Sequence, residues 1–172
     1  PIRRSWQRCA ALGLRMDMRP TIEPLGRADF GERRGRSERL RMAALSAMQR
    51  LHGGAGGDGV VILADGDGVV IERHGDGGFA DRAERVALRP GVVWSEGSTG
   101  TNAIGTALAE RRDVTVFGAE HFFESHRVLT CTAAPIFGPD GETLGVLDLS
   151  GRAEGRASSA ADDVRAAVAA IE

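Results

Sequence analysis

The side chains best suited to chemistry gather in the middle of this 172-residue sequence, beginning at Trp94. From Trp94 to Gly105, glycines and hydroxyl residues precede a helical pattern of apolar residues. The free backbone N–H groups at a helix start attract anions and other hydrogen-bond acceptors. Two interpretations stay open: a ligand or anion cradle, or a plain turn in which Thr99 or Thr101 caps the helix.

A second group combines histidine, glutamate and cysteine between Glu120 and Cys131. These residue types bind iron and zinc, but His121 and His126 are five residues apart, so a helix would point them in different directions. Catalysis by Cys131 would need a base and an oxyanion donor beside it, and nothing in the sequence places them there. We expect neither a metal site nor catalysis. The histidines would satisfy local hydrogen bonds, and the neighbouring phenylalanines would close a core or pocket.

A third group consists of small residues in two central strands, Thr130 to Ala134 and Gly145 to Asp148. They indicate either helices packed closely on the sheet or a cavity above it. Asp148 is a carboxylate in an otherwise apolar strand, so its burial would demand a polar partner. We interpret it as an anchor for a loop, with a polar handle for a ligand as the alternative.

Composition narrows the function classes. All 22 basic residues are arginine, and the absence of lysine excludes a Walker-type phosphate loop, Schiff-base chemistry and a pyridoxal enzyme within this chain. Two cysteines, Cys9 and Cys131, do not make a disulfide framework, which favours a reducing cytoplasm. No apolar run approaches the roughly 20 residues of a membrane helix, and no signal peptide is recognisable. We therefore expect a cytoplasmic protein without membrane contact.

Charge is unevenly distributed along the chain. Residues 1–50 hold 12 arginines against 5 acidic residues, whereas residues 51–172 hold 10 against 19. A basic arm on an acidic body is one signature of nucleic-acid contact. Here the arginines alternate with apolar residues at helical spacing, so we interpret them as a solvated helix face.

The periodicity of apolar residues changes along the chain and predicts an alternation of helices and strands. Ser37 is the expected N-cap of the helix at 37–51. Residues 16–35 are expected to be irregular because prolines and glycines interrupt them, and residues 75–85 are expected to be a loop or short helix. The expected helices cover 3–13, 37–51, 101–111, 120–127 and 158–172, and the expected strands cover 60–64, 69–73, 86–88, 114–117, 129–137 and 144–150.

Two turn motifs, Asp65–Gly68 and Gly138–Gly141, join neighbouring strands as hairpins and so predict an antiparallel sheet. The last two strands are apolar on both faces, so both faces must be covered. The helices at 37–51 and 158–172 would cover one face and the middle segment the other. The predicted fold class is α+β.

Five separated motifs resemble a known family when they are taken in order. They are Trp94-Ser-Glu96, Gly100–Leu108, Gly118–Phe122, Leu129–Ile136 and Gly145–Gly151. The chain resembles the GAF sensory domain of acetoin-operon-type, sigma-54-dependent transcriptional regulators of the Fis family. Ser5–Cys9 with Gly13-Leu14 is similar to the start of those proteins.

The resemblance implies a GAF-like fold, with an antiparallel sheet, terminal helices on one face and a ligand pocket covered by loops and helices on the other. It also implies a longer regulator, of which this chain would be an N-terminal fragment: residues 1–36 would form a helix and linker, and 37–172 the sensory domain. DNA and sigma-54 RNA polymerase would be contacted only by an ATPase domain and a helix-turn-helix outside this chain.

We expect a non-catalytic sensor that binds a small, mostly uncharged, oxygen-bearing metabolite, without a cofactor or metal, and forms a homodimer through the helices at 37–51 and 158–172. The alternatives are an iron-based gas or redox sensor, a ligand-free dimerisation module and a GAF-type methionine sulfoxide reductase. The expected ligand-binding residues are Trp94, Thr101, Asn102, Phe117, His121, Phe122, Phe123, Thr130, Thr132 and Asp148.

Overall fold

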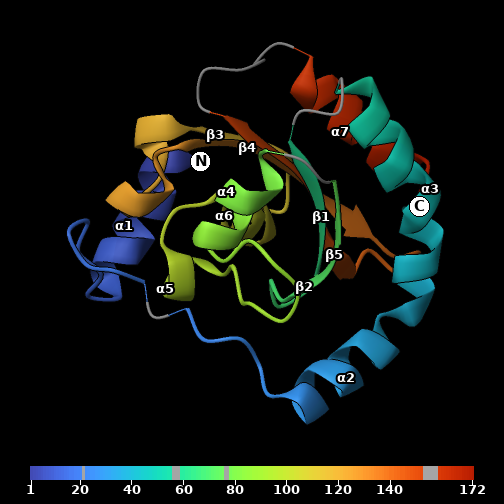
Figure 1. Cartoon of the computed structure of the whole chain (residues 1–172), viewed down its shortest axis with the longest axis horizontal. Coiled ribbons are helices and arrows are strands. Elements are labelled where there is room, and N and C mark those ends of the chain that lie inside the picture. The colour runs from blue at the N-terminus through green and yellow to red at the C-terminus, as the bar shows by residue number, and fades with distance from the viewer. Residues whose placement is uncertain (21, 56–58, 76–77, 153–158) are drawn as a thin grey trace.

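A computed structural model describes residues 1–20, 22–55, 59–75, 78–152 and 159–172, and its centre is a five-stranded antiparallel sheet (Figure 1). The strands follow the order β2-β1-β5-β4-β3 across the sheet. Their bounds are β1 Val60–Asp65, β2 Val70–His74, β3 Val114–Phe117, β4 Leu129–Phe137 and β5 Thr143–Arg152. The predicted α+β class and antiparallel sheet are confirmed.

Both predicted hairpins are present, and local chemistry closes each turn. In the first, Asp65 Oδ1 accepts hydrogen bonds from the N–H groups of Asp67 and Val69 at 3.0 and 2.9 Å, and Gly68 supplies the positive φ of 84°. In the second, the Arg111 guanidinium donates to Gly141 O at 2.6 Å. The turn residues therefore fix the register of the strands that they join.

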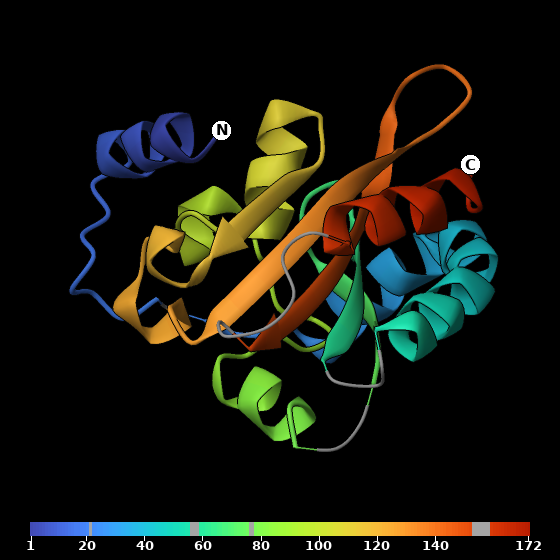
Figure 2. The same cartoon turned by 90° about the horizontal axis from the view of Figure 1, so that it is seen from above.

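One face of the sheet is covered by helices α3 (Glu38–Gly54) and α7 (Ala160–Ala169), and we call it the helix face (Figure 2). Ala44, Met48 and Leu51 of α3 pack with Val164 and Val168 of α7 in one apolar cluster. The stripe spacing predicted both helices, and their place on one face is confirmed. Of the predicted helix 158–172, Ser158 lies outside the described residues.

The opposite face is covered by the middle of the chain, which we call the roof. It consists of α4 (Ala80–Arg85), α5 (Glu96–Thr99), α6 (Ala103–Glu110) and two short 3-10 turns, η1 (Gly118–Glu120) and η2 (Glu124–His126). Apolar side chains of the roof, among them Ile104 and Ala107, join the core with Val146 and Ile62 of the sheet. The prediction that the middle segment covers this face is confirmed, but 120–127 forms a 3-10 turn rather than one short helix.

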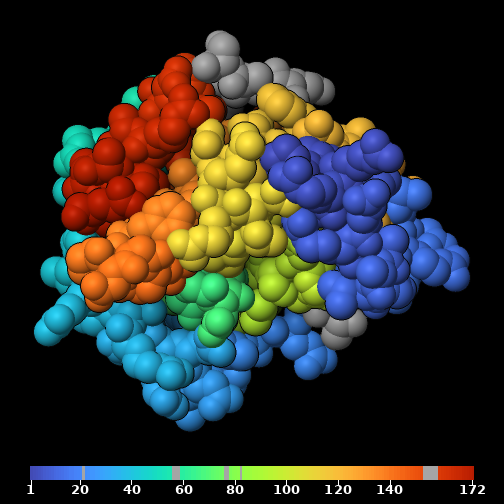
Figure 3. Space-filling model, turned by 180° about the vertical axis from the view of Figure 1, so that it is seen from behind, coloured from blue at the N-terminus to red at the C-terminus, as the bar shows by residue number. Residues whose placement is uncertain are grey.

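The N-terminal helix α1 (Ile2–Ala11) lies against the outside of the roof, next to α5 and α6 (Figures 1 and 3). It matches the predicted helix at 3–13. It does not share the helix face with α3 and α7.

Two local predictions are wrong, and a third is confirmed only in part. Residues 16–35 are not wholly irregular, because α2 occupies Arg27–Arg36; its arginines pair with acidic residues of the first hairpin, and Arg33 lies 2.5 Å from Asp67. Ser37 is the N-cap residue of α3 as expected, but its side chain makes no capping bond, since its backbone continues directly from α2. Residues 86–88 are a turn rather than a strand, with Ala87 at a φ of 60°.

Candidate functional site

The roof carries a group of aromatic rings centred on His126. The Trp94 ring stacks on the His126 ring with centroids 4.9 Å apart. Phe123 and His121 meet the same imidazole edge-on, at centroid distances of 6.1 and 6.4 Å. Trp94 is oriented by its indole N–H, which donates to Ala87 O at 3.1 Å. Each of these rings is almost fully buried.

Both histidines are electrically neutral at pH 7 and leave polar atoms without partners. Burial lowers the pKa of His121 to about 4 and that of His126 to about 4. His121 Nδ1 lies 3.1 Å from Gly118 O, whereas its Nε2 has no hydrogen-bond partner. The backbone of Thr99 approaches His126, but neither ring nitrogen of His126 makes a hydrogen bond.

The sheet presents a second polar group on the roof side. Asp148 stands opposite Ile62 and Ala133 in the strand register, and both of these residues belong to the roof-side core. The Ser150 hydroxyl donates to Asp148 Oδ2 at 2.6 Å and lies 3.1 Å from Cys131 Sγ. Asp148 Oδ1 is buried without a partner.

Burial raises the pKa of Asp148 to about 7, and the Ser150 hydroxyl only partly offsets this effect. Burial also raises the pKa of Cys131, with the Asp148 carboxylate adding to it, so the thiol stays protonated. We use "roofed site" for the roof residues Trp94, His121, Phe123 and His126 together with the roof-side sheet residues Asp148, Ser150 and Cys131; Trp94 and Cys131 belong to the same core cluster.

A family model described as the MimR N-terminal domain matches residues 2–170. The chain belongs to this family. Its relatives include the acetoin catabolism regulatory protein of Cupriavidus necator, which is 35% identical over 151 residues, or 87% of this chain and 23% of the relative. The acetoin dehydrogenase operon transcriptional activator AcoR of Bacillus subtilis is 42% identical over 73 residues, or 42% of this chain and 12% of the relative.

A solved structure shares the fold of this MimR-type domain. In the crystal structure of the E. coli DhaR(N)–DhaL complex, one chain aligns with a TM-score of 0.93 and 18% identity, over 99% of this chain and 58% of that chain. The MimR-type domain spans about a quarter or less of the length of the curated relatives it matches. Within the described residues, its helices are too short or too polar to cross a membrane.

Of the predicted ligand-binding residues, the MimR-type domain brings Trp94, His121 and Phe123 together and places Asp148 on the sheet below. Thr101 and Asn102 lie in the roof but are occupied by other contacts. The Asn102 side chain caps α6 by accepting from Gly105 N at 2.8 Å and donates to Thr99 Oγ1 at 2.9 Å. The expected caps Thr99 and Thr101 do not perform this role.

The structure separates three predicted residues from this group. Thr132 lies two residues from Ala134, which packs on the helix face, and alternate residues of a strand share a face. Thr130 and Thr132 therefore face away from the roof. Phe117 is paired with Thr130 in the register and is 40% exposed. The expectation that these three line one pocket with Trp94 is wrong.

Phe122 is also placed differently from the expectation. Its ring packs edge-on against Trp6 of α1 at 5.5 Å and against Phe123 at 5.6 Å, in a small cluster that includes Cys9. It joins α1 to the roof rather than lining the roofed site.

Sequence reasoning missed His126 and Ser150 as members of the site. The five-residue spacing of the histidines argued against a shared site only if the segment were one helix. The η2 turn is 3-10, and it brings the His126 ring back toward His121. Ser150 carried a usable signal, since it follows Asp148 by two residues on the same strand face.

The MimR-type domain offers no obvious metal centre in the parts of the chain that are described. No group of three or more histidine, cysteine, aspartate or glutamate side chains converges there. The two cysteines are free and buried in different clusters, Cys9 with Phe122 and Cys131 on the sheet. That the protein needs no metal stays a prediction.

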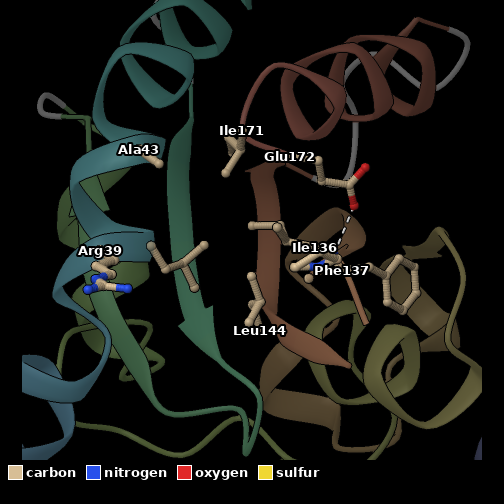
Figure 4. Close-up of a pocket in the computed structure, with 10 residues that line it drawn as sticks. Arg39, Ala43, Ile136, Phe137, Leu144, Ile171 and Glu172 are labelled. Atoms are coloured by element: carbon tan, nitrogen blue, oxygen red, sulfur yellow. Dashed lines mark hydrogen bonds between the residues drawn. The ribbon is translucent and has the colours of Figure 1, made fainter. Parts of the chain in front are cut away.

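A surface groove of about 520 Å³ lies on the other side of the sheet, between α3, the end of the chain after α7, and the second hairpin (Figure 4). Leu40, Ile136, Leu144 and Ile171 give it an apolar floor. Glu172 closes one end, where its carboxylate accepts from Phe137 N at 2.9 Å. The groove is open to solvent and shares no lining residue with the roofed site.

Proposed function

We propose that this chain is a non-enzymatic sensory domain of a transcriptional regulator and that it binds a small, uncharged, oxygen-bearing molecule in the roofed site. The observation that carries the proposal is the set of buried polar atoms without partners. Within the roofed site they are His121 Nε2, both ring nitrogens of His126, and Asp148 Oδ1; His52 Nε2 and Arg127 Nε are also buried without a partner but lie outside the site as defined. Buried polar groups are normally hydrogen-bonded, and exceptions call for a partner such as a ligand or water.

The chemistry of these atoms favours hydroxyl and carbonyl groups. A neutral imidazole nitrogen either donates or accepts according to its tautomer, and a carboxyl group with a pKa near 7 does the same according to its protonation. The roofed site itself contains no arginine, and the Arg127 Nε beside His126 in the chain is also buried without a partner. A multiply charged phosphate would therefore find too little counter-charge. Apolar walls with a few placed polar atoms are typical of small-ligand sites.

The regulatory role rests on the relatives. The names of the Cupriavidus and Bacillus proteins describe regulators, and both cysteines of this chain are buried thiols in separate clusters, which does not favour a thiol reductase. We infer that the ligand controls a downstream output. DNA and sigma-54 RNA polymerase would be contacted through other parts of a full-length protein, in the cytoplasm.

A ligand screen tests the proposed binding. We expect a saturable thermal shift with one of a panel of small diols, hydroxyketones, alcohols and aromatic acids, with a Kd in the micromolar range or weaker because so few atoms are in contact. Each of His121→Ala and Asp148→Ala should weaken that binding about fivefold, since each removes a hydrogen bond worth about 1 kcal/mol. Titration calorimetry would measure the loss.

The matched control is Thr132→Val, which is nearly isosteric and lies on the helix face. It should leave the affinity unchanged. Equal losses in all three variants would place the ligand elsewhere. A bound transition metal that co-purifies stoichiometrically and is lost in His126→Ala would favour the iron-sensor alternative instead.

We also propose that the domain forms a homodimer through α3 and α7. Between these helices the surface is lined by small residues, Ala43, Ala166 and Ala170 among them, and Met42 of α3 is 57% exposed. Small residues allow two helix pairs to approach closely, and the adjoining apolar groove (Figure 4) extends the contact surface.

Sedimentation measures this association. Met42→Glu places a charge in the contact surface and should weaken the dimer at least tenfold. The control is Leu12→Glu, at a similarly exposed apolar residue directly after α1, on the roof side of the sheet, and it should leave the mass unchanged. A parent protein that sediments as a monomer at high micromolar concentration would exclude the dimer.

A further inference from the structure

Helix α1 is fastened to the roof by a set of long-range polar contacts. The Arg8 guanidinium donates to both carboxylate oxygens of Glu96, at 2.6 and 2.8 Å, and to Glu110 at 2.8 Å. The Ser5 hydroxyl donates to Thr101 Oγ1 at 2.7 Å. These bonds tie α1 to α5, to α6 and to the turn between them.

A second set of contacts ties α1 to the other half of the roof. The Trp6 indole N–H donates to Glu120 O at 2.8 Å, and the Trp6 ring packs edge-on against Phe122. Helix α1 therefore bridges the two segments that supply the roofed site, 94–106 with Trp94 and 118–126 with both histidines. A direct link between the two segments is the bond from Phe122 N to Thr101 O at 3.2 Å.

The roofed site is closed when α1 is in place. Trp94, His121, His126 and Asp148 are each at most 1% exposed. A ligand of several heavy atoms reaches their unpaired nitrogen and oxygen atoms only if part of the roof moves. The sheet below is held by backbone hydrogen bonds between five neighbouring strands, so the movable side is the roof.

The contacts of α1 are of a kind that releases readily. Arg8 is 37% exposed at its side chain, and partly exposed ion pairs contribute little net stability because water replaces them. When Arg8 leaves, the Glu96 carboxylate keeps the hydrogen bond from Thr106 Oγ1 at 3.0 Å. The Glu96 and Glu110 side chains are only 8% and 7% exposed, so releasing Arg8 has a cost, and releasing α1 also uncovers the small cluster of Cys9, Phe122 and Phe123. Separating α3 or α7 from the sheet would expose a larger apolar core.

We propose that α1 is a strap that gates the roofed site: docked, it holds the two roof segments together, and released, it lets them part and admits the ligand. This inference rests on the proposed ligand site. It makes the N-terminal helix a point of regulation, because anything that binds or displaces α1 changes access to the site.

Hydrogen exchange followed by mass spectrometry tests the strap without a ligand. In Arg8→Ala we expect amides in 96–106 and 118–126 to exchange at least tenfold faster, while amides of β1 and β5 keep their rates. The control is Arg3→Ala on the exposed side of the same helix, which should change neither region. An equal rise in the sheet strands would show that Arg8 only supports global stability and would overturn the proposal.

A second measurement locks α1 with a disulfide and uses the buried thiol of Cys131 to report access to the roofed site. Cys9 Sγ lies 3.6 Å from Thr101 Oγ1, so a Thr101→Cys variant oxidised with diamide should join its new thiol to Cys9 and lock α1 down. Labelling of Cys131 by methyl methanethiosulfonate, located by peptide mass spectrometry, should be at least tenfold slower in the oxidised form than in the reduced form of the same variant. Equal labelling rates would mean that access does not pass through the strap.

Failure of the strap and failure of the sensor are distinguishable. A hydroxyketone or diol from the screen that binds the locked and reduced forms at the same rate would refute the strap and leave the sensor intact. Slower labelling of Cys131 in the oxidised form, combined with no binding of any compound in the screen at millimolar concentration, would support the strap and refute a small-molecule sensor of this class.

Discussion

Replacing Gly105 by alanine should destabilise the domain by about 3 kcal/mol, although the same exchange usually strengthens a helix. A Cβ on Gly105 would lie 2.7 Å from Glu96 N and 2.8 Å from Trp94 O. Both atoms belong to the backbone of the turn before α5, so no side chain can rotate away to relieve the clash. Overpacking of this kind costs about 1–3 kcal/mol or more, which exceeds the gain of about 1 kcal/mol in helix propensity. Urea unfolding followed by circular dichroism would measure the difference.

The matched control is Gly53→Ala in the last turn of α3, where an added Cβ meets no atom within 4 Å. That variant should be neutral or slightly more stable. Gly105→Ala should also change the fluorescence of Trp94, because the displaced turn carries this ring away from His126. An unchanged unfolding midpoint for Gly105→Ala would mean that the turn yields, and the rigid positioning of Trp94 would be wrong.

Asp148→Asn should stabilise the domain by about 4 kcal/mol at pH 8 and leave it unchanged near pH 3. The folded-state pKa of Asp148 is about 7, well above its ordinary value of 3.8. Well below pH 3.8 the carboxyl group is neutral in both the folded and the unfolded chain. As the pH rises toward 7 the unfolded chain releases its proton first, so the wild-type protein loses stability across that interval. Asparagine stays neutral throughout and removes the loss.

The measurement is the difference in free energy of unfolding between the two proteins at several pH values. His121 and His126 also make stability depend on pH: their lowered pKa values reduce the free energy of unfolding as the pH falls below 6.5. This contribution is the same in both proteins, so it cancels in the difference. A constant difference from pH 4 to pH 8 would mean that Asp148 ionises normally. If the predicted gain appears together with a weaker ligand, the carboxyl group is retained for binding at a cost in stability.

The sequence predicted the layers well because their signals are strong and local. The Asp-Gly turns define both hairpins, and the apolar stripes of α3 and α7 have helical spacing over many residues. Helix α2 escaped prediction because prolines and glycines surround it and none of its residues is buried. Its position depends on ion pairs such as Arg34 with Glu72, which no local pattern reveals.

The site was harder to predict than the fold. The β4 strand is buried along nearly its whole length, so the sequence has no polar alternation to show which residues face the roof. A one-residue error in that assignment reverses every side chain, and this reversal moved Thr130 and Thr132 into the expected pocket. Trp94 and His121 were predicted correctly because they lie in the roof, whose position follows from the order of the segments. No assignment of strand residues to one face of the sheet was needed.

The position of Asp148 in β5 has a consequence for how a bound molecule would reach the far side of the domain. Its chain neighbours Leu147 and Leu149 point through the sheet and pack with the core beneath α3 and α7. A change of backbone angle at Asp148 therefore tilts two side chains on the helix face without passing through any intermediary. In the proposed sensor, one peptide unit would therefore separate a ligand-contacting carboxyl group from the side chains that pack under α3 and α7.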